Sequence, residues 1–219
     1  MDYYFDFRVV WANLGNLFMG LMSGLGMALV SLVIGVAIGL VLAFAYVSTN
    51  PFLRRVAKTY VTVLRNIPLL VIIFIVYFGL PDAGIKFDKV FSFIFSLSIY
   101  AGAYMTEVFR AGLTAIPKGI VEAGQSIGLS KRQLRLDIIL PIMFSMVLPA
   151  MGNYLISLFK DTSLAASITV HELTYNARKI NVETFRVFEA WLTAAAFYVA
   201  ACYLIASLLR AIERKVMIK

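Results

Sequence analysis

The sequence has little charge and almost no cysteine. Only 15% of its 219 residues are charged, and Cys202 is the single cysteine. Soluble domains carry about a quarter charged residues. A lone cysteine excludes a disulfide within the chain and a thiolate metal site, and His171 has no companion ligand at metal-binding spacing. The composition therefore argues against both a soluble domain and a disulfide-stabilised one.

The sequence also lacks the motifs of the common enzyme classes. It contains no Walker A glycine loop, no catalytic triad, no paired-carboxylate motif and no zinc signature. We therefore predict that the chain has no catalytic residue, metal or cofactor of its own and cannot hydrolyse ATP. The net charge of +8 comes without the aromatic and basic motifs of a nucleic-acid-binding domain. We assign this charge to membrane topology and contact with anionic membrane lipid.

Long apolar runs dominate what is present. The sequence is 61% hydrophobic, and its mean hydropathy is +0.87. A helix needs about 20 residues to cross the hydrocarbon core of a bilayer. The runs predict an all-α, polytopic membrane protein that forms a single transmembrane domain with five transmembrane helices. The expected spans are about 16–47, 60–81, 88–109, 138–159 and 188–209.

The basic residues predict the orientation of these spans. Thirteen of the 20 Lys and Arg residues fall in three segments, which follow the first span, the third span and the fifth span. Basic residues concentrate on the cytoplasmic side of a membrane. We therefore expect the N-terminus outside and the C-terminus in the cytoplasm. A cleaved signal peptide is not expected, because Asp2 and Asp6 outnumber Arg8 near the start and the apolar run is too long.

A charged segment separates the third and fourth spans, and its sequence predicts a helical loop over 110–141. The spacing of Ile116, Ile120, Ala123 and Ile127 places them on one helical face. Gly128 is expected to end the first helix in the left-handed conformation. The pattern Ser130-x-x-Gln133 is typical of a capping box that begins a second helix. We expect a helix, a glycine turn and a helix on the cytoplasmic side.

Other local patterns predict single features. Glu107 and Arg110 are three residues apart and can pair on a helix. The pattern Thr169-x-x-Glu172 predicts another capping box, which would begin a short helix. Two Gly-x-x-x-Gly pairs in the first span, Gly20 with Gly24 and Gly35 with Gly39, indicate either close helix packing or merely the abundance of glycine in membrane helices.

The charged segment resembles the hallmark of a known family. The chain is similar to the permease subunits of bacterial ATP-binding-cassette importers for polar amino acids, which are type I importers served by a periplasmic binding protein. The hallmark is Glu-Ala-Ala, three residues, Gly, nine residues and Ile-x-Leu-Pro, and this sequence departs from it only in having Gly124 for the third residue. The matching residues are Glu122, Ala123, Gly124, Gly128, Ile138, Leu140 and Pro141. Further blocks begin at Arg65, Tyr104 and Lys160.

The resemblance implies a function for the charged segment. The segment would be the coupling loop, whose short helix enters a groove of a cytoplasmic ATPase dimer that binds ATP and Mg²⁺. It also implies a second permease copy or a homologous permease, a periplasmic amino-acid-binding protein and a polar amino acid as substrate. The membrane would then be a bacterial inner membrane, with the N-terminus in the periplasm and the C-terminus in the cytoplasm. The alternative for the segment itself is an amphipathic helix that only lies on the membrane surface.

The resemblance further marks Lys160, Asp161, Thr162 and Ser163 as the substrate path. Asp161 could receive the ammonium group, and Lys160 or the two hydroxyl groups could receive the carboxylate. Alternatively, Lys160 and Asp161 pair with each other, and Thr162 or Ser163 caps the next helix. Two other functions remain open: a secondary amino acid transporter, and a membrane scaffold that transports nothing.

Overall fold

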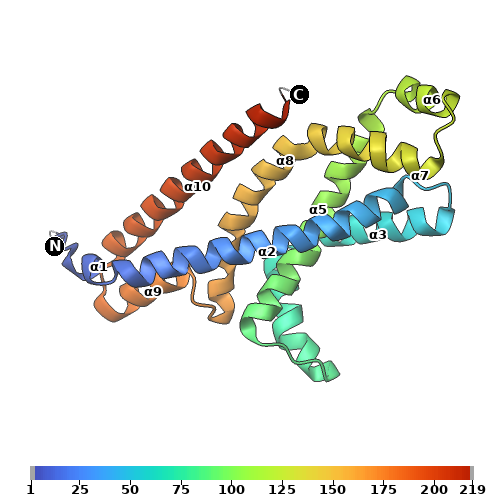
Figure 1. Ribbon diagram of the computed structural model, residues 1–219. Coiled ribbons are helices and arrows are strands. Elements are labelled where there is room, and N and C mark those ends of the chain that lie inside the picture. Colours follow the sequence, from blue (N-terminus) through green and yellow to red (C-terminus); the bar gives the residue numbers. More distant parts are fainter. Residues whose placement is uncertain (1–2, 218–219) are drawn as a thin grey trace. The chain divides into compact units, whose positions relative to one another are not determined.

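The computed structural model describes residues 3–217, which are helical over most of their length and contain no β-strand (Figure 1). The α-helices are α1 (Arg8–Ala12), α2 (Leu14–Tyr46), α3 (Pro51–Asn66), α4 (Leu69–Phe74), α5 (Lys89–Ala115), α6 (Lys118–Ser126), α7 (Lys131–Gln133), α8 (Leu140–Asp161), α9 (Leu173–Thr184) and α10 (Val187–Met217). The π-helices are η1 (Ile75–Gly79) and η3 (Leu134–Ile139), and the 3₁₀-helices are η2 (Leu80–Ala83) and η4 (Thr162–Ile168). The expected all-α class is confirmed.

Among residues 3–217, three helical stretches are long and apolar enough to cross a membrane, where the sequence predicts five spans. They are Leu14–Tyr46, Lys131–Ile168 and Val187–Lys215. A fourth candidate consists of two helices, Pro51–Asn66 and Leu69–Ala83, with a bend of 101° between them. Helix α5 is long enough to cross a membrane but is not among these stretches.

The bend means that the expected span 60–81 is not one straight helix. Helix α3 ends at Asn66, and Ile67 has an extended backbone with ψ of 130°. Pro68 follows at the N-cap of α4. A proline disfavours the helical conformation of the residue before it and donates no backbone hydrogen bond, so the helix stops here. By contrast, α8 continues through Pro149.

The chain folds as two compact units. The first comprises the chain up to Leu32, Pro68–Ser98 and Leu155–Ser207. In this unit α9 packs so closely against α2 that a Cβ added to Gly20 would lie 2.7 Å from the backbone carbon of Glu172. Ser31 Oγ donates to the backbone oxygen of Ile94 at 3.3 Å and so links α2 with α5.

Glu189, near the start of α10, holds the N-terminal segment of the first unit. Its carboxylate accepts hydrogen bonds from the Tyr3 hydroxyl and, at 2.8 Å, from the backbone N–H of Asp6. The Arg186 guanidinium lies 3.6 Å from the same carboxylate and donates to the Tyr4 carbonyl at 2.7 Å. Glu189 is buried, and these partners offset the cost of burying its charge.

The second unit comprises Val33–Ile67, Ile99–Tyr154 and the chain from Leu208. Helices α2 and α5 approach closely, because a Cβ on Gly39 would lie 2.4 Å from Met105 Cβ. The Tyr60 hydroxyl donates to the Ile99 carbonyl at 2.7 Å and fixes α3 against α5. The Gly-x-x-x-Gly pairs are therefore packing sites, since all four glycines lie where a Cβ would meet another element within 3 Å.

Candidate functional site

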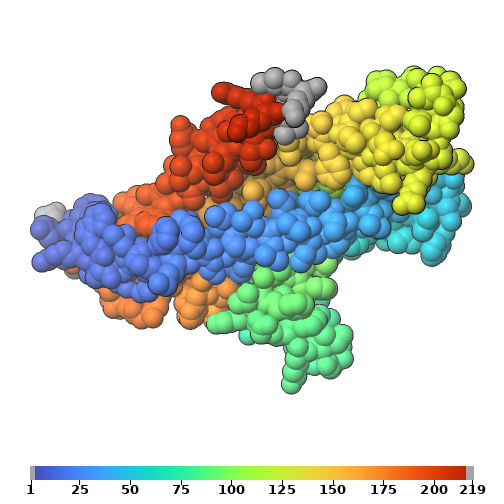
Figure 2. All heavy atoms as spheres, viewed as in Figure 1, coloured from blue at the N-terminus to red at the C-terminus, as the bar shows by residue number. Residues whose placement is uncertain are grey.

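The loop between α5 and α8 forms an elbow, here called the elbow loop (residues 116–141), whose atoms are yellow-green to yellow in Figure 2. Its first helix, α6, ends at Ser126, and Gly128 follows with φ of +82°. Two backbone hydrogen bonds close the turn: Gly128 donates to Gln125 at 3.0 Å, and Leu129 donates to Gly124 at 3.1 Å. This is the glycine-terminated helix end that the sequence predicts.

The second arm of the elbow begins at Ser130. The Gln133 backbone N–H donates to Ser130 Oγ, and the Gln133 side chain accepts from the Ser130 backbone N–H at 3.0 Å. This confirms the expected capping box. The helix continues as the short α7, passes through the π-helical turn η3 and becomes α8 at Leu140, so the elbow is joined directly to a candidate span.

The contact that closes the elbow is made by Gly124. Gly124 is buried, and a Cβ at this position would lie 2.6 Å from Leu134 Cδ1 and 3.5 Å from Ile138 Cδ1. The absence of a side chain at Gly124 therefore lets Leu134 and Ile138 reach α6. The two arms are held together by apolar contact as well as by the turn.

The face expected for the first arm is wrong at both ends. The sequence places Ile116 and Ile127 on one helical face, but α6 begins at Lys118 and ends at Ser126, and Ile127 is 76% exposed. Glu122 and Ala123 are also exposed, so the hallmark residues divide between the closed inner side of the elbow and its solvent-facing surface.

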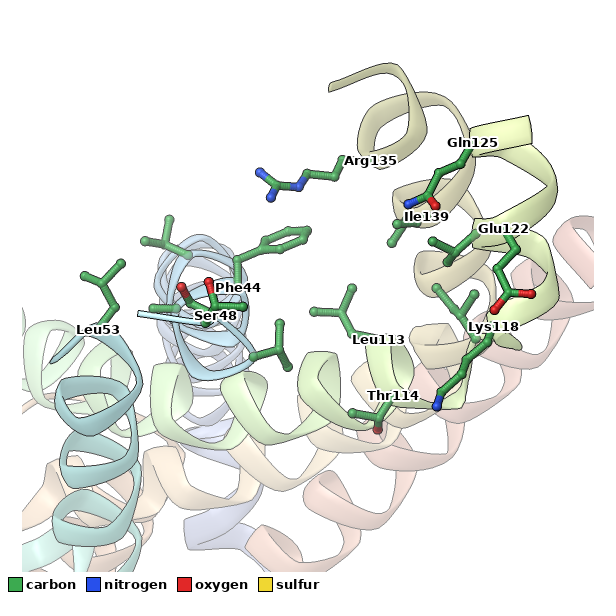
Figure 3. Close-up of a pocket in the computed structure, with 16 residues that line it drawn as sticks. Phe44, Ser48, Leu53, Leu113, Thr114, Lys118, Glu122, Gln125, Arg135 and Ile139 are labelled. Atoms are coloured by element: carbon green, nitrogen blue, oxygen red, sulfur yellow. The ribbon is translucent and has the colours of Figure 1, made fainter. Parts of the chain in front are cut away.

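A cavity of about 1050 Å³ lies beside the elbow in the second unit (Figure 3). Its walls come from the end of α2, from α5 and from the elbow. Arg135 extends from η3 toward the side on which Phe44 lies, and the Gln125 amide points to the same space. The other labelled residues at the cavity are Ser48, Leu53, Leu113, Thr114, Lys118, Glu122 and Ile139.

The expected substrate-path residues lie in the first unit, at the end of α8 and the start of η4. Lys160 is exposed, and Asp161 and Ser163 are half-buried. Thr162 is buried, and its hydroxyl donates to the Phe159 carbonyl at 2.6 Å. The Thr162 hydroxyl thus closes a local hydrogen bond where α8 becomes 3₁₀-helical. Within residues 3–217, no ion pair joins Lys160 to Asp161 at 4.0 Å or less.

Glu172 is the residue whose structural role the sequence patterns misassign. Thr169 does not cap a helix, because it lies in the left-handed region with φ of 59°. Glu172 is itself the N-cap of α9, and its carboxylate accepts from the backbone N–H groups of Thr174 at 2.8 Å and Tyr175 at 2.7 Å. The Tyr198 hydroxyl on α10 donates a third hydrogen bond at 3.1 Å.

Burial sets the electrostatic character of this carboxyl group. Glu172 is inaccessible to solvent, and the loss of hydration raises its pKa from 4.5 to about 7. The hydrogen bonds from Thr174, Tyr175 and Tyr198 favour the charged form and oppose this shift. Glu172 therefore changes its charge near neutral pH at a junction of α9 and α10.

A match to a known protein family identifies the class of protein to which this chain belongs. Residues 35–218 match the family described as the binding-protein-dependent transport system inner membrane component. The chain belongs to this family. It is thus a permease subunit of the amino-acid ABC transporter type, which is not itself an enzyme.

Relatives of this permease align along almost its whole length. The probable amino-acid ABC transporter permease protein YckA of Bacillus subtilis is 35% identical over 98% of this chain and 95% of YckA. The glutamine transport system permease protein GlnP of Escherichia coli K12 is 33% identical over 98% of this chain and 99% of GlnP. The L-cystine transport system permease protein TcyB of Bacillus subtilis is 32% identical over 94% of this chain and 91% of TcyB.

Solved structures share the fold of the permease. One chain of an amino acid ABC transporter crystallised with histidines superposes with a TM-score of 0.90, is 30% identical and covers 97% of this permease. A chain of the methionine ABC transporter MetNI in an inward-facing conformation gives a TM-score of 0.81 over 93% of the permease. It is 22% identical, and that likeness shows the shared fold alone.

Proposed function

We propose that this permease carries a polar amino acid from the periplasm to the cytoplasm by alternating access, driven by a separate ATPase that acts on the elbow loop. The observation that carries the proposal is the closed elbow. Its turn is fixed by Gly128, its arms are packed through Gly124 and Leu134, and its second arm continues into α8. Such an element transmits a displacement at its surface to a membrane helix.

Glu122 is the residue that meets the ATPase in this proposal. Its side chain is exposed on α6 and forms no ion pair among the residues that the structure describes. A free carboxylate can accept charge-assisted hydrogen bonds from the partner. Ala123 beside it is small and exposed, which permits close approach. ATP and Mg²⁺ bind to the ATPase dimer and not to this chain.

The proposed membrane arrangement has the five expected spans, and α5 is the span expected at 88–109, which the three apolar stretches and the bent pair of helices do not include. Three buried hydroxyl groups of α5 donate to its own backbone: Ser96 to Ser92 at 2.7 Å, Ser98 to Ile94 at 2.6 Å and Thr106 to Gly102 at 2.7 Å. The buried Ser92 hydroxyl is the exception on this helix, since it has no hydrogen-bond partner among the described residues. Polar groups that are satisfied within a helix can lie in the membrane without water. The N-terminus is periplasmic and the C-terminus cytoplasmic, as the distribution of basic residues predicts.

The proposed substrate is a polar amino acid, in keeping with relatives named for glutamine and cystine and a related transporter crystallised with histidines. Lys160, Asp161 and Ser163 are accessible for contact with it, whereas the Thr162 hydroxyl is already bonded. A periplasmic binding protein delivers the amino acid. A second copy of this chain or a homologous permease completes the membrane part of the importer.

The test is uptake by proteoliposomes that contain the permease, its ATPase and its binding protein. The amino acids offered are L-glutamine, L-histidine and L-cystine, each radiolabelled. We expect ATP-dependent uptake of at least one of them. Uptake that needs an ion gradient and no ATP would identify a secondary transporter instead, and a stable complex without uptake would identify a scaffold.

Substitutions in the elbow test the coupling. Glu122→Lys is expected to reduce ATP-driven uptake at least about tenfold. The substitution replaces the carboxylate with a positive charge, which would face the hydrogen-bond donors of the ATPase. Gly128→Val is expected to do the same, because a β-branched residue is strained at φ of +82°. Both variants should still insert into the membrane, which is checked by their yield in the membrane fraction.

Glu183→Lys is the matched control for the charge reversal. Glu183 is an exposed carboxylate on α9, far along the chain from the elbow, and its side chain is 59% exposed. Uptake by this variant should match the wild type. Normal ATP-driven uptake by both elbow variants would refute the proposed coupling.

A further inference from the structure

The second unit contains a small polar pocket that lies apart from both the elbow loop and the Lys160–Ser163 stretch in sequence. Its volume is about 310 Å³, at the lower end of the range for small-molecule sites. Apart from one valine, every residue that lines it is polar. These residues are Tyr46, Thr62, Arg65, Asn66, Tyr104 and Glu107.

The walls of this pocket, here called the Arg65 pocket, are held in place by packing between α2, α3 and α5. Gly39 brings α2 against Met105 on α5. The Tyr60 hydroxyl joins α3 to α5 through the Ile99 carbonyl. Tyr104 is held from behind by stacking on Tyr154, with ring centroids 5.2 Å apart. The pocket is thus formed before any ligand arrives.

Arg65 provides a cation without a partner in this pocket. Its guanidinium lies over the Tyr104 ring at 5.0 Å from the centroid. It makes no hydrogen bond and no ion pair with the residues that the structure describes. A guanidinium has five donors in a fork that fits a carboxylate with two parallel hydrogen bonds. The contact with the Tyr104 ring holds the guanidinium at the pocket and leaves its N–H donors for a ligand.

Glu107 and Asn66 supply acceptors in the same pocket. Both hydrogen bonds from Arg110 go to Glu107 Oε2, at 2.9 and 2.7 Å, and leave Oε1 unused. Asn66 Nδ2 donates to the Thr62 carbonyl at 2.7 Å, and this leaves Asn66 Oδ1 as a free acceptor. The last turn of α3 also lines the pocket, and the carboxyl end of a helix favours positive charge.

We propose that the Arg65 pocket binds the charged head of a free α-amino acid, with the carboxylate on Arg65 and the ammonium group on Glu107 Oε1 and Asn66 Oδ1. The inference rests on the proposed transport function and gives it a second amino acid contact point, in the second unit. A zwitterion fits because the pocket presents a cation without a partner, Arg65, and a carboxylate oxygen, Glu107 Oε1, that the pair with Arg110 leaves unused. The near absence of apolar lining disfavours a lipid, whose acyl chains need an apolar wall.

The test measures binding of the radiolabelled amino acid that uptake selects from L-glutamine, L-histidine and L-cystine. The protein is the purified permease–ATPase complex in nanodiscs of phosphatidylcholine and phosphatidylglycerol, without binding protein, and the assay is scintillation proximity. We expect saturable binding that unlabelled amino acid displaces. The methyl ester, which lacks the carboxylate, and the N-acetyl derivative, which lacks the ammonium group, should not displace it.

Substitutions assign the binding to the pocket. Arg65→Gln should weaken binding at least about tenfold, because a charge-assisted pair is lost, and Arg65→Lys should weaken it less. Glu107→Gln should also weaken binding, because it removes the negative charge that contacts the ammonium group. Lys58→Gln is the matched control, because Lys58 lies two turns earlier on α3 and does not line the pocket. Elution as a monodisperse complex shows that each variant is folded.

Unchanged affinity in Arg65→Gln and Glu107→Gln would overturn the inference, and so would the absence of binding in a wild-type complex that still imports with its binding protein. Displacement of the amino acid by added phosphatidylethanolamine would instead assign the pocket to a lipid headgroup. These outcomes are separate from failure of the proposed function. That failure would appear as the absence of ATP-dependent uptake by the wild type.

Discussion

At the residue scale, the structure decides what the glycines of α2 do. The spacing of Gly20, Gly24, Gly35 and Gly39 is compatible with close packing and also with chance in an apolar helix. The structure places backbone or side-chain atoms of another element within 3 Å of an added Cβ at all four positions. Gly15 and Gly26 in the same helix have nothing within 4 Å. In the sequence, the packed glycines differ from Gly15 and Gly26 only in that they occur in pairs four residues apart.

This difference predicts opposite outcomes for two similar substitutions. Gly39→Ala should destabilise the protein by about 1–3 kcal/mol, because the added carbon would lie 2.4 Å from Met105 Cβ and 2.8 Å from backbone. Gly26→Ala should be neutral or stabilise α2 by up to about 1 kcal/mol, because alanine favours a helix and the space is open. Thermal unfolding followed by size-exclusion chromatography in detergent measures both, and equal midpoints would contradict the packing argument.

Single residues of the candidate site differ in how far sequence could place them. The hallmark motif predicts where Glu122 and Gly128 lie in the elbow, because these positions depend on local helix geometry. The burial of Thr162 depends on its contact with Gly24, which is distant in the chain, so its hydroxyl appears available from sequence when it is not. The Arg65 pocket brings together Tyr46, Arg65 and Glu107 from three helices, and no local pattern marks such an assembly.

At the element scale, two similar sequence patterns give different helix starts. Ser130-x-x-Gln133 forms the expected capping box. Thr169-x-x-Glu172 does not, because burial of Glu172 against α2 and α10 makes it the cap of α9 and turns Thr169 into a left-handed linker. Capping is a local interaction, and it is predictable where the segment is exposed. Tertiary contacts override it where the segment is buried.

The cap of α9 predicts a pH dependence of stability. The pKa of Glu172 is about 7 in the folded protein and 4.5 in the unfolded chain, so the folded state holds the proton more tightly between these values. The stabilisation is present below about pH 4.5 and is lost as pH rises to about 7, by an amount on the order of 3 kcal/mol. Glu172→Gln should remove this part of the pH dependence.

The measurement is the thermal unfolding midpoint at pH 5 and pH 8, followed by tryptophan fluorescence. Glu183→Gln on the same helix is the control, because Glu183 is exposed and its removal should leave the pH profile of the wild type. A pH profile of Glu172→Gln that matches the wild type would show that the carboxyl group does not titrate in this interval.

At the scale of the whole molecule, the all-α class follows from composition, while the number and course of the spans do not. The expected span 60–81 contains a break of 101°, because Pro68 stops α3 locally, and hydropathy alone does not report such a break. Helix α5 lies at the span expected at 88–109 but is not among the long apolar stretches, and three of its buried hydroxyl groups bond to its own backbone.

Cysteine labelling tests the proposed orientation of the whole chain. Cys202→Ser removes the only cysteine, so an added cysteine reports a single site. Lys86→Cys, between η2 and α5, should react with a membrane-impermeant maleimide in intact spheroplasts. Lys131→Cys, at the start of α7, should react only after permeabilisation. Both lysines are exposed, so access by itself should not limit the reaction. The reverse pattern would invert the proposed topology.

The internal contacts of the elbow loop bear on how a permease could come to work with a different ATPase. Its turn, its capping box and its Gly124–Leu134 contact all lie between Lys118 and Ile139, so the elbow is stabilised from within. We therefore expect that this segment can be exchanged between related permeases without rebuilding the membrane helices. Under the proposed coupling, the preference for one ATPase over another should be transferred with this stretch of about twenty residues.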